Sequence, residues 1–218
     1  MSAVTRRYEA VIFDMDGLLI DSERPIRDAW LRLEARLTEA DYLQTVGRSR
    51  PDSLAVLAAK LGSEARALAL YEQVDAELTE RFGTAGFPLK PGALALLQAL
   101  RARGVPLAVA SSTRHAKVLE RLGAAGLIDF FGPIHGGDQV ARGKPHPDLF
   151  ELAAQSLGID PARALVFEDS SYGARGALAA GAGVVLVPDL KAPDPEIAPQ
   201  CLVLASLDEA PAHLPNWF

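Results

Sequence analysis

Two aspartates that stand one residue apart, directly after a short apolar run, are the residues of this chain best suited to chemistry. Residues 11–13 predict a buried strand that ends at Asp14 and Asp16. Because side chains alternate along extended backbone, we expect both carboxylates to project to the same side and Met15 to point away. Two carboxylates held together repel each other unless a cation lies between them or one keeps a proton. The pair therefore predicts a divalent-metal site or a nucleophile beside a general acid; the alternative is a solvated Asp turn.

Three more polar clusters stand at or near the ends of other apolar runs. They are Ser111-Ser112-Thr113, Lys144 and Glu168-Asp169. In a parallel sheet the ligand site lies beyond the carboxyl ends of the strands, so we expect all four clusters to meet at one edge. Carboxylates, a lysine and hydroxyls with backbone amides are the groups that metal-assisted phosphoryl transfer requires. Asp169 could join Asp14 in binding Mg²⁺, which prefers few carboxylates together with phosphate and water.

Alternating strands and helices must position these clusters, and they predict an α/β fold with a Rossmann-like parallel sheet. Strands are expected at residues 11–13, 106–110, 133–135, 164–167, 184–187 and 202–204. Helices are expected at residues 114–122, 147–157 and 172–180, and Leu94, Leu97 and Leu100 predict the face of a further helix. Helices should therefore cover the sheet on both faces.

Residues 23–82 carry no strand pattern, which predicts a helical insertion after the first strand. Ser22 is expected to cap its first helix, over residues 26–37, and the chain should then turn through Gly47. Two more helices are expected at residues 51–61 and 63–82. We therefore predict two domains. These are an α/β core of residues 1–20 and 88–218 and a helical cap of residues 21–87.

The composition limits the partners that this chain can have. Its 218 residues include 22 basic and 28 acidic ones, and no basic block appears, which argues against nucleic acid or an anionic membrane as a partner. The single cysteine, Cys201, excludes an internal disulfide, and its apolar neighbours predict a buried structural thiol. No apolar run has the length of a signal peptide or a membrane span. We expect a cytoplasmic monomer.

The polar clusters also resemble a known family. Asp14-Met15-Asp16-Gly17, Ser111, Lys144-Pro145 and Glu168-Asp169-Ser170, in this order and at these separations, resemble the four motifs of the haloacid dehalogenase (HAD) superfamily. A helical insertion after the first strand is similar to the beta-phosphoglucomutase-like phosphatase branch. The resemblance implies a HAD-like Rossmann core with a helical cap, a Mg²⁺ cofactor and a small phosphorylated metabolite as the substrate.

The resemblance also implies a role for each motif residue. Asp14 would be the nucleophile that becomes an aspartyl-phosphate, and Asp16 would be the general acid and then the general base. Asp14, the main-chain carbonyl of Asp16 and Asp169 would coordinate Mg²⁺, with Glu168 assisting directly or through water. The transferring phosphoryl group would be bound by Ser111, Ser112 and Lys144. The second acid, Asp16, argues against dehalogenation, because dehalogenases of the family lack it.

Substrate recognition is the least specified part of the prediction. Arg48 and Arg50 lie in a turn that resembles the specificity loop of the family, although they could equally be solvated turn residues. His115 could face the leaving group or lie exposed in the first turn of a helix.

Two positions bear on the choice between a phosphatase and a mutase. Ile26 stands where beta-phosphoglucomutases carry a histidine, and no counterpart of their cap lysine follows Lys60. Both differences favour hydrolysis. We therefore predict a magnesium-dependent phosphatase of a small metabolite such as a sugar phosphate. The alternatives are a phosphosugar mutase and a non-catalytic binding module on the same fold.

Overall fold

One parallel sheet forms the centre of the protein. The computed structural model describes residues 8–218, and within them six strands pair in the order β3-β2-β1-β4-β5-β6. The strands are β1 (Ala10–Phe13), β2 (Leu107–Ser111), β3 (Ile134–Gly136), β4 (Ala164–Glu168), β5 (Gly183–Leu186) and β6 (Leu202–Val203). Every pair is parallel. The predicted α/β class is therefore confirmed.

The first strand lies between β2 and β4 and is buried along its whole length. Val11 pairs with Leu107 of β2 on one side and with Leu165 of β4 on the other, which sets the register of these three strands. Its alternate side chains enter two separate apolar clusters, Val11 and Phe13 in one and Ile12 in the other. A continuous apolar run is what a strand covered on both faces requires. The polar residues that follow β1, β2 and β4 consequently meet at one edge.

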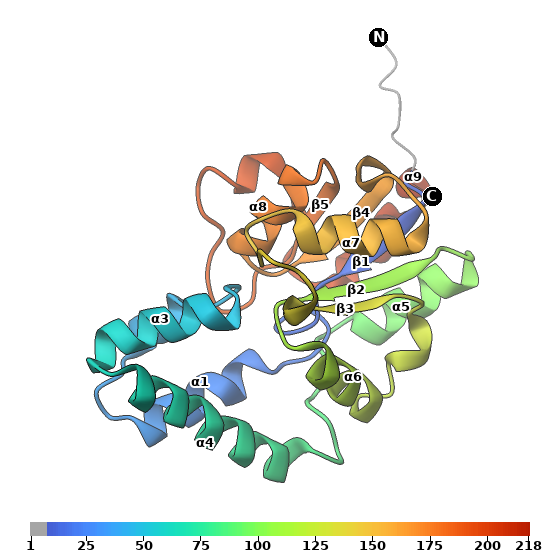
Figure 1. Cartoon of the computed structure of the whole chain (residues 1–218). Helices are drawn as coiled ribbons and strands as arrows, with labels where there is room; N and C mark the ends of the chain where they lie inside the picture. The colour runs from blue at the N-terminus through green and yellow to red at the C-terminus, as the bar shows by residue number, and fades with distance from the viewer. Residues whose placement is uncertain (1–7) are drawn as a thin grey trace.

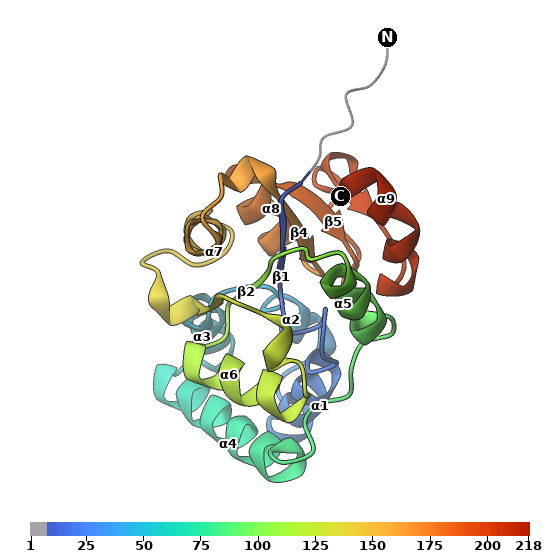
Figure 2. The same cartoon turned by 90° about the vertical axis from the view of Figure 1, so that its right-hand side faces the viewer.

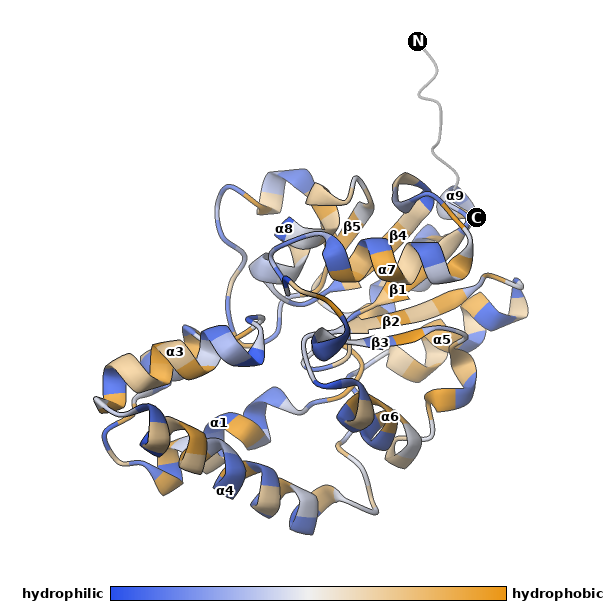
Figure 3. Ribbon diagram, in the orientation of Figure 1, coloured by the Kyte–Doolittle hydropathy of each residue, from blue (hydrophilic) through white to orange (hydrophobic). Residues whose placement is uncertain are grey.

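Helices cover both faces of this sheet (Figure 1). They are α5 (Ala93–Ala102), α6 (His115–Ala124), α7 (Asp148–Leu157) and α8 (Ser171–Ala179). Buried side chains of α7 and α8 pack with Ile12, and those of α5 and α6 pack in the other cluster with Val11 and Phe13. The two layers of helices on opposite sides of the strands are visible from a second direction in Figure 2. In Figure 3 the strands are hydrophobic while the helices alternate, as helices with one buried face should.

Four helices form the insertion, which lies to one side of the sheet at the lower left of Figure 1. They are α1 (Glu23–Leu33), α2 (Glu39–Leu43), α3 (Arg50–Leu61) and α4 (Glu64–Phe82). Trp30 fills the space between them: its ring lies 5.2 Å from that of Tyr42 and 5.1 Å from that of Tyr71, both in edge-on contact. The helical insertion predicted from residues 23–82 is thus present.

The two chain connections of the insertion run side by side. The first connection (residues 17–22) and the second connection (residues 83–92) are joined by two backbone hydrogen bonds. The amide of Asp21 donates to the carbonyl of Pro88 at 2.8 Å, and the amide of Lys90 donates to the carbonyl of Leu19 at 2.9 Å. Residues 21–87 remain our proposal for the extent of a separate cap domain.

Shorter elements complete the described chain. They are the 3-10 helices Ile128–Phe130, Gly137–Gln139, Pro161–Arg163, Ala198–Gln200 and Leu207–His213, followed by α9 (Leu214–Trp217). Among the described residues, no helix is both long enough and apolar enough to cross a membrane.

Local predictions in the insertion were wrong at three points. The first helix ends at Leu33, so Leu37 is buried beyond it, not within it. Ser22 occupies the N-cap position of this helix, but its side chain makes no capping hydrogen bond, because its hydroxyl donates to Asp16 Oδ1 at 2.6 Å. The predicted turn also contains α2, which begins with a capping box between Thr38 and Asp41.

Two smaller predictions in the core also need correction. Leu94 is 40% exposed, and the buried face of α5 is formed by its neighbours Ala93, Leu96, Leu97 and Leu100. Cys201 is only half-buried and lies directly before the exposed edge strand β6. This partial burial still raises the pKa of its thiol to about 11.

Candidate active site

A cavity of about 150 Å³ lies between the insertion and the carboxyl edge of the sheet. Its floor is formed by the polar residues that follow β1, β2 and β4, together with Lys144 and Arg121. Its opposite wall is formed by insertion residues, namely Glu23, Ile26, Trp30, Tyr42, Arg48, Arg50 and Tyr71. All four polar clusters singled out in the sequence therefore contribute to one cavity.

Lys144 joins two of these clusters. Its ammonium lies 2.5 Å from Asp14 Oδ1 and 2.6 Å from Glu168 Oε1, and its side chain is 1% exposed. Burial alone would lower the pKa of Lys144, but the two carboxylates outweigh it and the pKa lies above its ordinary value. The lysine is thus a fixed buried cation between the ends of β1 and β4.

Glu168 uses both of its oxygens within the protein. While Oε1 is bound to Lys144, Oε2 accepts hydrogen bonds from the amides of Asp169 and Ser170, each at 3.0 Å, and from the Ser170 hydroxyl at 2.9 Å. The same hydroxyl accepts a hydrogen bond from the amide of Gly173 and so caps α8. Glu168 therefore fixes Lys144 and the start of α8 in place.

Asp14, Glu168 and Asp169 form a group that could hold a metal ion, because one oxygen from each lies within 4.8 Å of the others. All three carboxylates are buried, and Asp14 and Glu168 share the buried Lys144. The group therefore has three carboxylates and one cation, and Asp169 has no cationic partner among the described residues. Oxygen donors with this excess charge fit a hard divalent cation.

Burial, and after it the neighbouring negative charges, shifts the pKa values of two of these acids. Burial, with help from Glu168 and Asp16, raises the pKa of Asp14 to about 8 despite the opposing effect of Lys144. Burial and the neighbouring carboxylates Glu168 and Asp14 likewise raise the pKa of Asp169 well above its usual range. A bound cation would lower the pKa of both Asp14 and Asp169.

Asp16 is held separately from Asp14. Its Oδ1 accepts hydrogen bonds from the Ser22 hydroxyl and from Arg121, both at 2.6 Å, and its Oδ2 accepts one from the Thr113 hydroxyl at 2.8 Å. The three donors come from the first connection, the loop after β2 and α6. They fix the carboxylate in the floor of the cavity.

Two serines at the end of β2 offer polar groups to the cavity. The hydroxyl of Ser111 accepts a hydrogen bond from the amide of Thr113 at 3.1 Å and lies 3.5 Å from Asp16 Oδ2. The buried hydroxyl of Ser112 has no hydrogen-bond partner within residues 8–218. Both serines precede the N-terminus of α6, where backbone amides favour an anion.

The insertion contributes an aromatic wall with one acid. The Tyr42 hydroxyl donates a hydrogen bond to Glu23 Oε2 at 2.5 Å, and burial raises the pKa of Glu23 to about 7. Arg48 stacks over the ring of Tyr172 at 4.5 Å, and Arg50 pairs with Asp75 at 3.3 Å. Both arginines line the cavity.

The structure does not bring every predicted residue to the site. His115 is not among the residues that line the cavity, and its amide donates to Asp138. Arg121 lines the cavity but was not predicted. In α6 it lies on the same buried face as Val118 and Leu122, so a charged residue at an apolar helical position was the only available signal.

Residues 8–181 match the family described as haloacid dehalogenase-like hydrolase. The chain belongs to this family of hydrolases. This HAD-like hydrolase is 35% identical over 210 residues to hexitol phosphatase A of Escherichia coli, with 93% of each chain covered. It is 32% identical over 177 residues to the phosphorylated carbohydrates phosphatase of Thermotoga maritima, which covers 79% of this chain and 82% of that one.

A solved structure agrees with these relationships. CbbY from Rhodobacter sphaeroides in complex with phosphate matches this HAD-like hydrolase with a TM-score of 0.76 and 27% identity, covering 93% of this chain and 96% of that one. The predicted membership of the HAD superfamily is therefore confirmed.

Proposed function

We propose that this HAD-like hydrolase is a Mg²⁺-dependent phosphatase of a small phosphorylated sugar or polyol, acting through an aspartyl-phosphate on Asp14. The observation that carries the proposal is the buried cluster of Asp14, Lys144, Glu168 and Asp169 beside the hydroxyls of Ser111 and Ser112. Lys144 holds only one oxygen of Asp14, so the other can attack phosphorus.

Each residue of the site has its own role in this reaction. Asp14 attacks phosphorus as the ester P–O bond breaks, and Asp16 gives a proton to the departing oxygen. Asp16 then takes a proton from the water that attacks the aspartyl-phosphate, which releases phosphate and restores Asp14. Lys144, Ser111 and Ser112 bind the phosphoryl oxygens.

Asp14, Asp169 and the main-chain carbonyl of Asp16 would hold Mg²⁺, which supplies positive charge to the phosphoryl group. Glu168 would act on the metal through water, since both of its oxygens already have protein partners.

The opposite wall of the cavity supports the choice of substrate. Glu23 and Tyr42 offer hydrogen-bonding groups to hydroxyls, and Trp30 and Tyr71 offer apolar faces to C–H bonds. The small volume of the cavity suits a metabolite of sugar size. The names of the relatives from Escherichia coli and Thermotoga maritima support the same class.

The test is a screen for phosphate release in the presence of Mg²⁺, with sugar phosphates and polyol phosphates beside nucleotides and phosphorylated amino acids. We expect release from a sugar or polyol phosphate, and its complete loss in Asp14→Asn, which keeps the shape of the side chain but removes the nucleophile. Release that persists in Asp14→Asn, or none from any compound, would contradict the proposal.

A second assay separates hydrolysis from mutase activity. Ile26 lines the cavity at the position where the mutases of the family carry a histidine, which favours hydrolysis. With beta-glucose 1-phosphate and a trace of the 1,6-bisphosphate, we expect free phosphate to accumulate faster than glucose 6-phosphate. The reverse order would make the protein a mutase.

A further inference from the structure

Asp189 is a buried carboxylate to which the proposed reaction gives no role. Its side chain is 1% exposed, and it lies in the loop that follows β5. Two residues earlier, the amide of Val187 donates to the carbonyl of Glu168 at 2.7 Å, so the loop leaves the sheet beside the end of β4. Asp189 therefore stands next to the strand end that carries Glu168 and Asp169.

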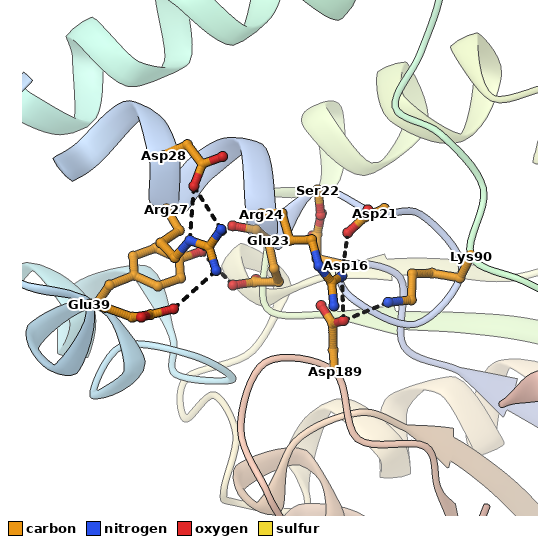
Figure 4. Close-up of polar contacts among 11 residues, drawn as sticks. Asp16, Asp21, Ser22, Glu23, Arg24, Arg27, Asp28, Glu39, Lys90 and Asp189 are labelled. Carbon is orange, nitrogen blue, oxygen red and sulfur yellow. Dashed lines mark hydrogen bonds and ion pairs between the residues drawn. The ribbon is translucent and has the colours of Figure 1, made fainter. Parts of the chain in front are cut away.

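Two cations hold one oxygen of this carboxylate (Figure 4). Arg24, in the first turn of α1, donates to Oδ1 at 2.7 Å, and Lys90, in the second connection, donates to the same oxygen at 2.5 Å. Arg24 also binds Asp21 in the first connection at 2.8 Å. The orientation of Asp189 is thus fixed by both chain segments that lead to the insertion.

The other oxygen, Oδ2, is buried and has no hydrogen-bond partner among residues 8–218. A buried carboxylate oxygen without a donor is destabilising, so this atom requires a partner that is not a side chain or an amide of the described chain. Beyond Arg24 and Lys90, two further acids lie near Asp189, which adds to the effect of burial in raising the pKa of Asp169 and of Glu23. A donor that also brings positive charge would satisfy both conditions.

We propose that Asp189 is a positioning residue for the metal, and that its Oδ2 accepts a hydrogen bond from a water molecule bound to Mg²⁺. The inference rests on the proposed function, which places Mg²⁺ between Asp14 and Asp169. Mg²⁺ usually keeps several of its waters in a protein site. Outer-sphere acceptors that orient such ligands typically change metal affinity by 10- to 100-fold when they are replaced.

The test is a calorimetric titration of Mg²⁺ into metal-free protein. In Asp189→Asn the amide keeps an oxygen for Arg24 and Lys90 but places a donor where Oδ2 accepts. We expect Mg²⁺ to bind at least about tenfold more weakly to this variant than to the wild type. The matched control is Asp21→Asn, which removes the same charge from the other partner of Arg24, and its affinity should stay within about twofold of the wild type.

A third variant tests whether Asp189 affects Mg²⁺ affinity through its hydrogen bond or only through its charge. Lys90→Met removes a cation that is bound to Asp189, so an effect of charge alone would tighten Mg²⁺ binding. Our proposal expects weaker binding, because Asp189 loses one of the two donors that orient it. Unchanged affinity in Asp189→Asn, or tighter binding in Lys90→Met, would overturn the inference. A wild type that binds no Mg²⁺ would instead overturn the metal site of the proposed function.

Discussion

At the scale of single residues, Asp14 and Asp16 have different surroundings although they are one residue apart. Asp14 is bound to Lys144 within the buried acidic group, whereas Asp16 is held by Ser22, Thr113 and Arg121. This division matches a nucleophile that also binds metal and an acid that handles the proton. The two aspartates should therefore respond differently to substitution.

We expect Asp16→Asn to lower kcat by about a hundredfold or more, because the leaving oxygen and the attacking water lose their proton partner. Mg²⁺ affinity should change by less than about threefold, since only the main-chain carbonyl of this residue is assigned to the metal. Steady-state kinetics and calorimetry measure the two effects. Thr113→Val, which removes one hydrogen bond to Asp16, is the control and should reduce kcat far less. Equal losses of kcat and of Mg²⁺ affinity in Asp16→Asn would contradict these roles.

The buried carboxyl of Glu23 should make the stability of the protein depend on pH. Its pKa is raised from the usual 4.5 to about 7, so the folded protein binds this proton more tightly than the unfolded chain does. Glu23 therefore lowers the free energy of unfolding progressively as pH rises from 4.5 to about 7. In Glu23→Gln, Tm relative to the wild type should rise across this window and stay level above it. Thermal melts in EDTA measure the difference, and a difference independent of pH would refute the buried-acid account.

Sequence alone predicted those site residues that follow strand ends, because buried strands impose a pattern and parallel topology brings their ends together. Arg121 and Asp189 were not predicted from the sequence, for two different reasons. Arg121 occupies an apolar helical position and reaches Asp16 only through the packing of α6. Asp189 lies in a loop without periodicity, and its link to Arg24 and Lys90 spans distant parts of the chain.

At the scale of elements, the turn after β1 depends on close approach of the backbone to the carboxylate of Asp169. Gly17 has φ +80°, and a Cβ atom built there would overlap the carboxylate of Asp169. Gly62 has a similar φ of +69° at the end of α3, but no atom lies within 4 Å of its built Cβ. A side chain at Gly62 would therefore meet backbone strain alone, whereas a side chain at Gly17 would meet both backbone strain and a steric conflict.

We expect Gly62→Ala to lower the free energy of unfolding by about 1 kcal/mol through strain alone, without an effect on Mg²⁺ binding. Gly17→Ala should lower it further and should also weaken Mg²⁺ binding, because the Asp169 carboxylate must move. Urea unfolding and calorimetric titration of both variants give the two quantities. Identical behaviour of the two variants would show that close packing at Gly17 is unimportant.

The predicted elements of the core agree with the structure more closely than those of the insertion. The core strands are short apolar runs that can pair in only one arrangement, and polar residues mark their ends. The insertion depends on side-chain competition instead: Ser22 could cap α1 but bonds Asp16, and the Thr38–Asp41 capping box starts a helix too short for periodicity. Local contacts of this kind are decided by tertiary neighbours.

At the scale of the whole molecule, the uncompensated acidic group should make stability depend on Mg²⁺ and pH together. The pKa of Asp14 rises from the usual 3.8 to about 8 on folding, so metal-free protein loses stability as pH rises through that range. Mg²⁺ at about 100 times its Kd adds about 2.7 kcal/mol to the free energy of unfolding. We expect the gain in Tm on adding Mg²⁺ to be larger at pH 8 than at pH 5.5. A gain that is larger at the lower pH would be inconsistent with a site built on Asp14.

The paired connections have a consequence for how such proteins can be altered. The chain leaves the core at Asp21 and returns at Pro88, and a direct backbone hydrogen bond between these two residues makes the ends of the insertion neighbours. An insertion whose two ends are neighbours can be exchanged for a different one without re-routing the core. We therefore expect a chimera that carries the insertion of a relative to retain the chemistry proposed for Asp14 while its substrate preference changes.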